Sequence, residues 1–76
     1  MLVTAKQILD RAAADGYAVV ISRMNYSAEL LGAVNAAEQH GAPLILELRP
    51  DPMGGRRTPE YLAWAAACCR EASVRI

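Results

Sequence analysis

Two short apolar runs, each set between segments of helical period, constrain this chain more than any other feature. The runs are Tyr17–Ile21 and Leu44–Leu48, and a third begins at Ser73–Ile76. Continuous rather than alternating apolarity is typical of strands in a parallel sheet that is covered on both faces. The runs recur every 27 to 30 residues with a helix between them. This spacing predicts a parallel α/β fold, and the (β/α)8 or TIM barrel has close to the same period.

Capping and terminating residues indicate where the helices between these runs begin and end. Thr4 and Gln7 have the spacing of a capping box, and Gly16 is a usual residue just past a helix. The second helix is predicted to begin with Asn25 or Ser27 as its cap. The third is predicted to open at Thr58-Pro59-Glu60. The positions predicted to face the core are Ile8, Leu9, Ala12, Ala13, then Leu30, Leu31, Val34, Ala37, then Leu62, Ala65, Ala66, Cys69.

The size of the chain limits what it can bury. A chain of 76 residues makes one domain at most, and such a domain buries only about 60% of the surface of its unfolded chain. Two strands and the beginning of a third leave open sheet edges and uncovered apolar faces. We therefore expect residues 1–76 to be a single partial domain, whose open faces are covered by self-association or by the missing remainder of a barrel.

Charge and composition exclude several classes of function. Eight basic and eight acidic residues give a net charge of zero, without the basic footprint of a nucleic-acid binder. The apolar runs are far shorter than a membrane span, and the N-terminus does not resemble a signal peptide. The adjacent Cys68 and Cys69 suit neither a structural disulfide nor, alone, a metal site. We expect a reduced, cytoplasmic protein with Cys69 in its core.

Two arginines are the strongest candidates for binding a ligand. Arg23 and Arg49 each stand just beyond the C-terminal end of a predicted strand, where parallel α/β proteins carry their ligands. Arginine suits phosphate or carboxylate groups. The alternative, that both arginines simply lie on surface loops, is equally open. Glu47 lies within the second strand, and a buried carboxylate there needs a partner, which one of these arginines can supply.

Two further features favour structural roles. The Gly54–Arg57 loop leads into a helix N-terminus and can grip an anion, but a solvated surface turn is the preferred interpretation. His40 is the only histidine and lies at a predicted helix C-terminus, where a cation is favoured. We interpret it as structural rather than as a metal ligand or a general base.

A series of short segments along nearly the whole chain matches a known family in order and spacing. They are Met1–Leu9, Gly16–Val19, Leu30-Leu31, Val34, Ala36–Glu38, Ala42–Leu46 and Pro59–Leu62. These segments resemble the opening of the class II ketose-bisphosphate aldolases, which are the zinc-dependent fructose- and tagatose-bisphosphate aldolases. The resemblance implies the N-terminal helix, the first two βα units and the start of the third strand of a TIM barrel.

The resemblance also implies a chemistry. In that family a zinc ion held by three histidines polarises the ketose carbonyl. Sugar bisphosphates are cleaved or formed with dihydroxyacetone phosphate as donor, and an aspartate transfers a proton. The family places its first zinc histidine and that aspartate in a His-x-Asp-His stretch after the third strand, and this chain contains none of these groups. We therefore expect an inactive N-terminal fragment that binds no zinc alone. Alternatives are a non-catalytic, anion-binding relative or a stand-alone interaction module.

The matched region departs from the family at the predicted ligand end. Arg23 stands where the family usually has asparagine, Arg49 where it has serine, and Asp51 where it has glycine, whereas Asn25 matches a frequent family asparagine. The resemblance thus implies Arg23, Asn25 and Arg49 as substrate-binding candidates for a phosphorylated sugar or other small anion. It implies no catalytic or metal residue in this chain. Two guanidiniums in place of small polar groups predict an altered substrate preference.

Overall fold

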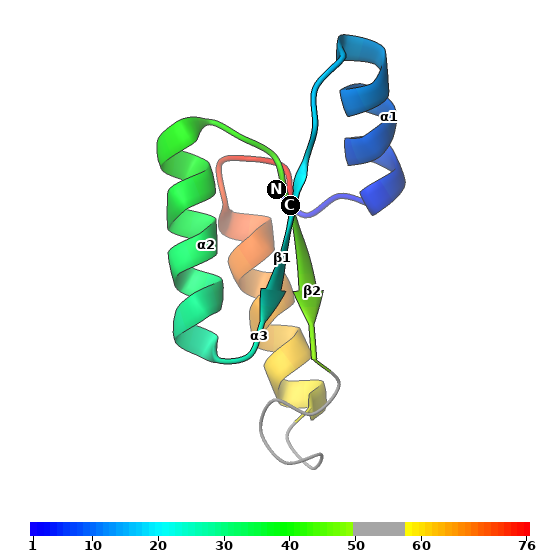
Figure 1. Cartoon of the computed structure of the whole chain (residues 1–76). Coiled ribbons are helices and arrows are strands. Elements are labelled where there is room, and N and C mark those ends of the chain that lie inside the picture. Colours follow the sequence, from blue (N-terminus) through cyan, green and yellow to red (C-terminus); the bar gives the residue numbers. More distant parts are fainter. Residues whose placement is uncertain (50–57) are drawn as a thin grey trace.

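The fold is a two-stranded parallel sheet with helices on one face. The computed structural model describes residues 1–49 and 58–76. Its elements there are α1 (Ala5–Asp15), β1 (Val20–Met24), α2 (Ser27–His40), β2 (Leu44–Leu48) and α3 (Thr58–Glu71). The α2 and α3 helices lie along the sheet, and α1 sits beside the N-terminal ends of the strands (Figure 1). The predicted parallel α/β arrangement is confirmed. None of these helices combines the length and apolar character that crossing a bilayer requires.

The predicted signals at the ends of α1 are confirmed. The backbone N–H of Gln7 donates to the Thr4 hydroxyl at 3.2 Å, and the backbone N–H of Thr4 donates to the Gln7 side chain at 2.9 Å. These reciprocal bonds satisfy donors that a helix N-terminus otherwise leaves unpaired. After the last turn, Gly16 has φ of +74°, a conformation that favours glycine.

The start of α2 differs from the prediction. Its N-cap residue is Tyr26, whose side chain makes no capping bond, so a cap at Asn25 or Ser27 is wrong. The carboxylate of Glu29 instead accepts from the backbone N–H of Asn25 at 2.7 Å. An acidic group in the first turn is also favoured by the helix dipole.

The core lies between the sheet and the pair α2 and α3. It consists of Met24, Leu30, Val34, Ala37, Leu44, Ala65, Cys69, Ala72 and Ile76. The predicted apolar stripes were too wide, because four of their residues are exposed: Leu9, Ala13, Leu31 and Leu62. In α3, Tyr61 is buried in place of Leu62. Adjacent helical residues point about 100° apart, so in α2 and α3 one residue of each such pair faces away from the narrow sheet. The α1 helix lies beside the beginnings of the strands and buries only Ile8 and Ala12.

The first strand is shifted from its predicted place. It runs over Val20–Met24 rather than Tyr17–Ile21 because it pairs only where β2 offers a partner, and that ladder starts at Val20 opposite Leu44. Coverage on both faces is also wrong in this chain, since Val20 and Ile21 are 66% and 61% exposed. The β2 strand matches its predicted limits.

The last residues approach β2 without forming a strand. Residues 73–76 were predicted to begin a third strand, and the structure assigns none there. The backbone N–H of Leu44 nevertheless donates to the carbonyl of Arg75 at 3.1 Å, and that of Ile76 donates to Met1 at 3.0 Å. The two chain ends therefore meet beside the beginning of the sheet (Figure 1).

Candidate functional site

Four polar side chains gather at the C-terminal end of the two strands, and we call them the rim cluster. Arg23 lies inside β1, so its predicted place just beyond the strand is wrong, whereas Arg49 directly follows β2 as predicted. Asn25 directly follows β1, and Glu47 lies inside β2. Residues two apart on a strand share a face, and the sheet register places Arg23 opposite Glu47. Together with Leu48, the four side chains line a cavity of about 400 Å³.

Arg23 and Glu47 form a bidentate ion pair across the sheet. Arg23 Nε donates to Glu47 Oε2 and Arg23 Nη2 donates to Glu47 Oε1, each at 3.1 Å. The hydrogen bonding to Glu47, followed by its negative charge, raises the pKa of Arg23 above its usual value. The predicted pairing of Glu47 with one of the arginines is confirmed. The burial of this carboxylate is not, since its side chain is 52% exposed on the sheet face without helices.

Arg49 is held differently from Arg23. Its Nη1 donates to Asn25 Oδ1 at 3.3 Å. Within residues 1–49 and 58–76, no carboxylate lies at ion-pair distance from this guanidinium. Glu29 fixes the backbone of Asn25 from the other side. This role of Glu29 was not predicted from the sequence. The pattern that could have indicated it is an acidic residue in the first turn after the predicted cap.

The other candidates from the sequence lie away from the rim cluster. His40 ends α2 and lines a cavity with Val20 and Leu44, the first residues of the two strands, so it is at the opposite end of the sheet. Cys69 is buried and Cys68 is half-buried, as predicted. Burial raises the pKa of the Cys69 thiol, which keeps it protonated and unreactive. The Gly54–Arg57 loop and Asp51 lie outside the described residues.

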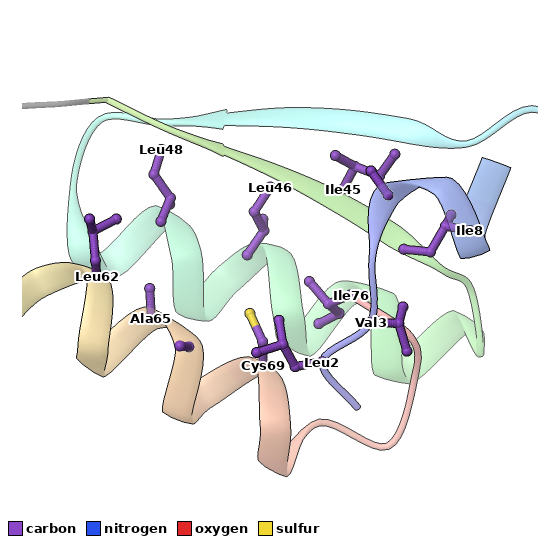
Figure 2. Close-up of a pocket in the computed structure, with 12 residues that line it drawn as sticks. Leu2, Val3, Ile8, Ile45, Leu46, Leu48, Leu62, Ala65, Cys69 and Ile76 are labelled. Carbon is purple, nitrogen blue, oxygen red and sulfur yellow. The ribbon is translucent and has the colours of Figure 1, made fainter.

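A second cavity, of about 250 Å³, is chemically different. Figure 2 shows it between β2, α3 and the N-terminal segment, with Leu62 at one end and Val3 and Ile8 at the other. Its walls are apolar side chains, and among the described residues that line it the Cys69 thiol is the one titratable side chain.

The fold and the rim cluster define the class of protein. Parallel strands whose polar side chains collect at their C-terminal ends are typical of α/β proteins that bind a ligand there. The family model described as "Fructose-bisphosphate aldolase class-II" matches residues 3–76. The chain therefore belongs to the class II fructose-bisphosphate aldolase family. Searches of curated proteins and of solved structures returned no match.

The zinc that this family implies does not fit the described part of the chain. Residues 1–49 and 58–76 bring no three His, Cys, Asp or Glu side chains together. Two carboxylates near the rim are already engaged, Glu47 by the Arg23 guanidinium and Glu29 by the Asn25 backbone. The described side chains of the rim cluster comprise two guanidiniums, one carboxylate and one neutral amide.

Proposed function

We propose that this chain is the ligand-binding N-terminal part of a class II aldolase-type TIM barrel. In this proposal the parent is a cytoplasmic, zinc-dependent enzyme of carbohydrate metabolism. It acts on ketose bisphosphates of the fructose or tagatose type, with dihydroxyacetone phosphate as donor. The rim cluster contacts an anionic group of the ligand. The observation that carries the proposal is a guanidinium, Arg49, beside the strand ends and bonded to a neutral amide.

The residues of the rim cluster have different roles in this proposal. Arg49 binds the ligand, because its remaining N–H donors match the oxygens of a carboxylate or phosphate. Asn25 orients Arg49 through its carbonyl oxygen and keeps an amide NH2 group with which to donate to the ligand. Arg23 already has both oxygens of Glu47 as acceptors, and its role is to position that carboxylate.

A second candidate function is anion binding without catalysis. One histidine occurs among the 76 residues, whereas the family's zinc takes three. The described residues also gather no alternative set of three metal donors. This observation favours a chain that binds its ligand at the rim cluster and does not itself cleave a carbon–carbon bond.

Ligand-observed NMR titration with dihydroxyacetone phosphate at low ionic strength tests the proposal. We expect Arg49→Gln to weaken binding about tenfold, since a hydrogen bond to a charged group contributes about 1.5–3 kcal/mol before solvent screening reduces it. Arg70→Gln is the matched control, because it also removes an exposed guanidinium. Arg70 lies in the last turn of α3, and that end of the helix lies toward the strand beginnings, away from the rim cluster (Figure 1). Equal affinities for the two variants would overturn the assignment of Arg49.

A further inference from the structure

We propose that the α-amino group of Met1 is a modification site, and that its acylation opens the contact between the two ends of the chain. As a free ammonium, this group holds the end of α3 and the residues that follow it. The inference goes beyond the proposed function, because it concerns the beginnings of the strands, at the opposite end of the sheet from the rim cluster (Figure 1). The modifying group is a small acyl group such as acetyl.

The ammonium of Met1 is bonded to three backbone carbonyls. It donates to Cys69 O at 2.6 Å, to Val74 O at 2.8 Å and to Ala72 O. Cys69 lies in the last turn of α3, and Ala72 directly follows that helix. The last carbonyls of a helix have no donor within the helix, and the helix dipole favours a positive charge beside them. The amino terminus therefore caps the C-terminal end of α3.

The backbone next to the ammonium also joins the two ends of the chain. The N–H of Ile76 donates to the carbonyl of Met1 at 3.0 Å, and the N–H of Val3 donates to the carbonyl of Ile76 at 3.0 Å. The side chains of Leu2, Val3 and Ile76 line one cavity (Figure 2). We call these contacts, together with the three bonds of the ammonium, the end closure.

The end closure reaches the sheet through the residue after Val74. The carbonyl of Val74 accepts from the ammonium of Met1. The carbonyl of Arg75, the next residue, accepts from the backbone N–H of Leu44 at 3.1 Å. Leu44 is the first residue of β2. A change at the amino group of Met1 is therefore expected to be felt at the beginning of that strand.

Acylation removes the donors that the end closure needs. Transfer of an acetyl group from a thioester forms a carbon–nitrogen bond at the amine and releases the thiol and one proton. An ammonium has a positive charge and three N–H donors, whereas the resulting amide is neutral and has one. This single N–H cannot replace the bonds to Cys69, Ala72 and Val74. It is also the weaker kind of donor, because hydrogen bonds from charged groups are stronger than those from neutral ones.

Lys6 provides a matched control for Met1. Its side chain is 81% exposed, and its ammonium pairs with Asp10 one turn along α1. Acetylation of Lys6 Nζ adds the same acyl group and removes the same positive charge. It differs in that the group it modifies contacts a side chain of its own helix rather than the end of α3.

The experiment compares four forms of the 76-residue chain. They are the unmodified chain, the chain acetylated at the Met1 amine, the chain acetylated at Lys6 Nζ, and a chain in which hydrogen replaces the Met1 amine. The last form removes the donors without adding bulk. Ligation of synthetic segments 1–67 and 68–76 at Cys68 gives each form with its native sequence otherwise unchanged.

Amide hydrogen exchange, followed by NMR, reports the opening of the end closure. We expect exchange at Ile76 and Leu44 to become about tenfold faster in both forms that lack the Met1 ammonium, the usual effect of one hydrogen bond to a charged group. This acceleration is measured relative to exchange at Val34, which is buried in α2. The form acetylated at Lys6 should exchange as the unmodified chain does.

Two results would overturn the proposal. One is unchanged relative exchange at Ile76 in the chain acetylated at Met1, and the other is an equal acceleration in the form acetylated at Lys6, which would mark a general effect of charge. If the chain acetylated at Met1 loses its circular dichroism spectrum, the form without the amine decides in its place. Faster exchange at Ile76 in that form, or loss of its spectrum, supports the proposal. Exchange as slow as in the unmodified chain overturns it, because the bulk of the acetyl group would then explain the loss.

Discussion

Truncation of Leu30 to alanine probes the packing of α2 on the sheet. Leu30 is fully buried, in the cluster that also holds Met24 and Leu44 from the two strands. A Leu→Ala change at such a site costs about 2–5 kcal/mol, from the lost transfer free energy and the cavity that remains. A domain of this length has about 4–11 kcal/mol of net stability, from roughly 0.05–0.15 kcal/mol per residue. The substitution therefore removes a large part of the free energy of unfolding.

The next residue supplies the control. Leu31→Ala removes the same atoms from the same helix, but Leu31 is exposed. A surface change of this kind alters stability by no more than about 0.5 kcal/mol, and alanine is the better helix former.

Urea unfolding followed by circular dichroism, at one fixed protein concentration, compares the two variants. We expect the midpoint for Leu30→Ala to fall by about 2 M, since small domains have slopes near 1 kcal/mol per M or somewhat above. The midpoint for Leu31→Ala stays within about 0.5 M of the unmodified chain. Similar losses in both variants would refute the assignment of the inner face of α2.

Three further outcomes are expected. Sedimentation should show self-association through the open sheet, reduced in the double variant Val20→Thr, Ile21→Thr; a monodisperse monomer before substitution would contradict this. After dialysis against a chelator the chain should retain no stoichiometric zinc and cleave neither fructose nor tagatose bisphosphate, and measurable turnover would refute it. In a whole parent barrel, Arg49→Ser should shift relative kcat/KM toward ketose bisphosphates more than Arg23→Asn, because Glu47 already holds Arg23; equal shifts would contradict this.

The parts of the fold that local chemistry fixes could be predicted from sequence. The limits of β2 follow from Gly41, which ends α2 in a left-handed conformation, and from the apolar run after Pro43. The capping box at Thr4 likewise depends on residues three apart. Such signals need no knowledge of the tertiary structure, and the structure bears them out.

The parts of the fold that depend on residues distant in the sequence could not be predicted from it. Pairing with β2 sets the limits of β1, so it includes Arg23 and Met24 rather than the apolar residues from Tyr17 onward. The exposure of Glu47 likewise depends on which elements cover the sheet. The α2 and α3 helices lie against the sheet face opposite to the one that carries the Glu47 side chain. Patterns of apolarity indicate which residues favour burial, but not whether a neighbour is present to bury them.

The candidate site shows the same division. That Arg23 and Arg49 lie together follows from their places near the C-terminal ends of two parallel strands, and the structure brings them to one cavity. Which arginine pairs with Glu47 depends on the register, which the sequence does not specify. The register places Arg23 opposite Glu47 and leaves Arg49 to Asn25.

Chemical-shift mapping on the ¹⁵N-labelled chain shows whether an anion binds at the C-terminal ends of the two strands. On addition of dihydroxyacetone phosphate, we expect the largest backbone amide shifts at Asn25, Leu48 and Arg49, which line the rim cavity. We expect small shifts at His40 and Ala42, beside the strand beginnings. Shifts concentrated at that opposite end, or none at millimolar ligand, would contradict it.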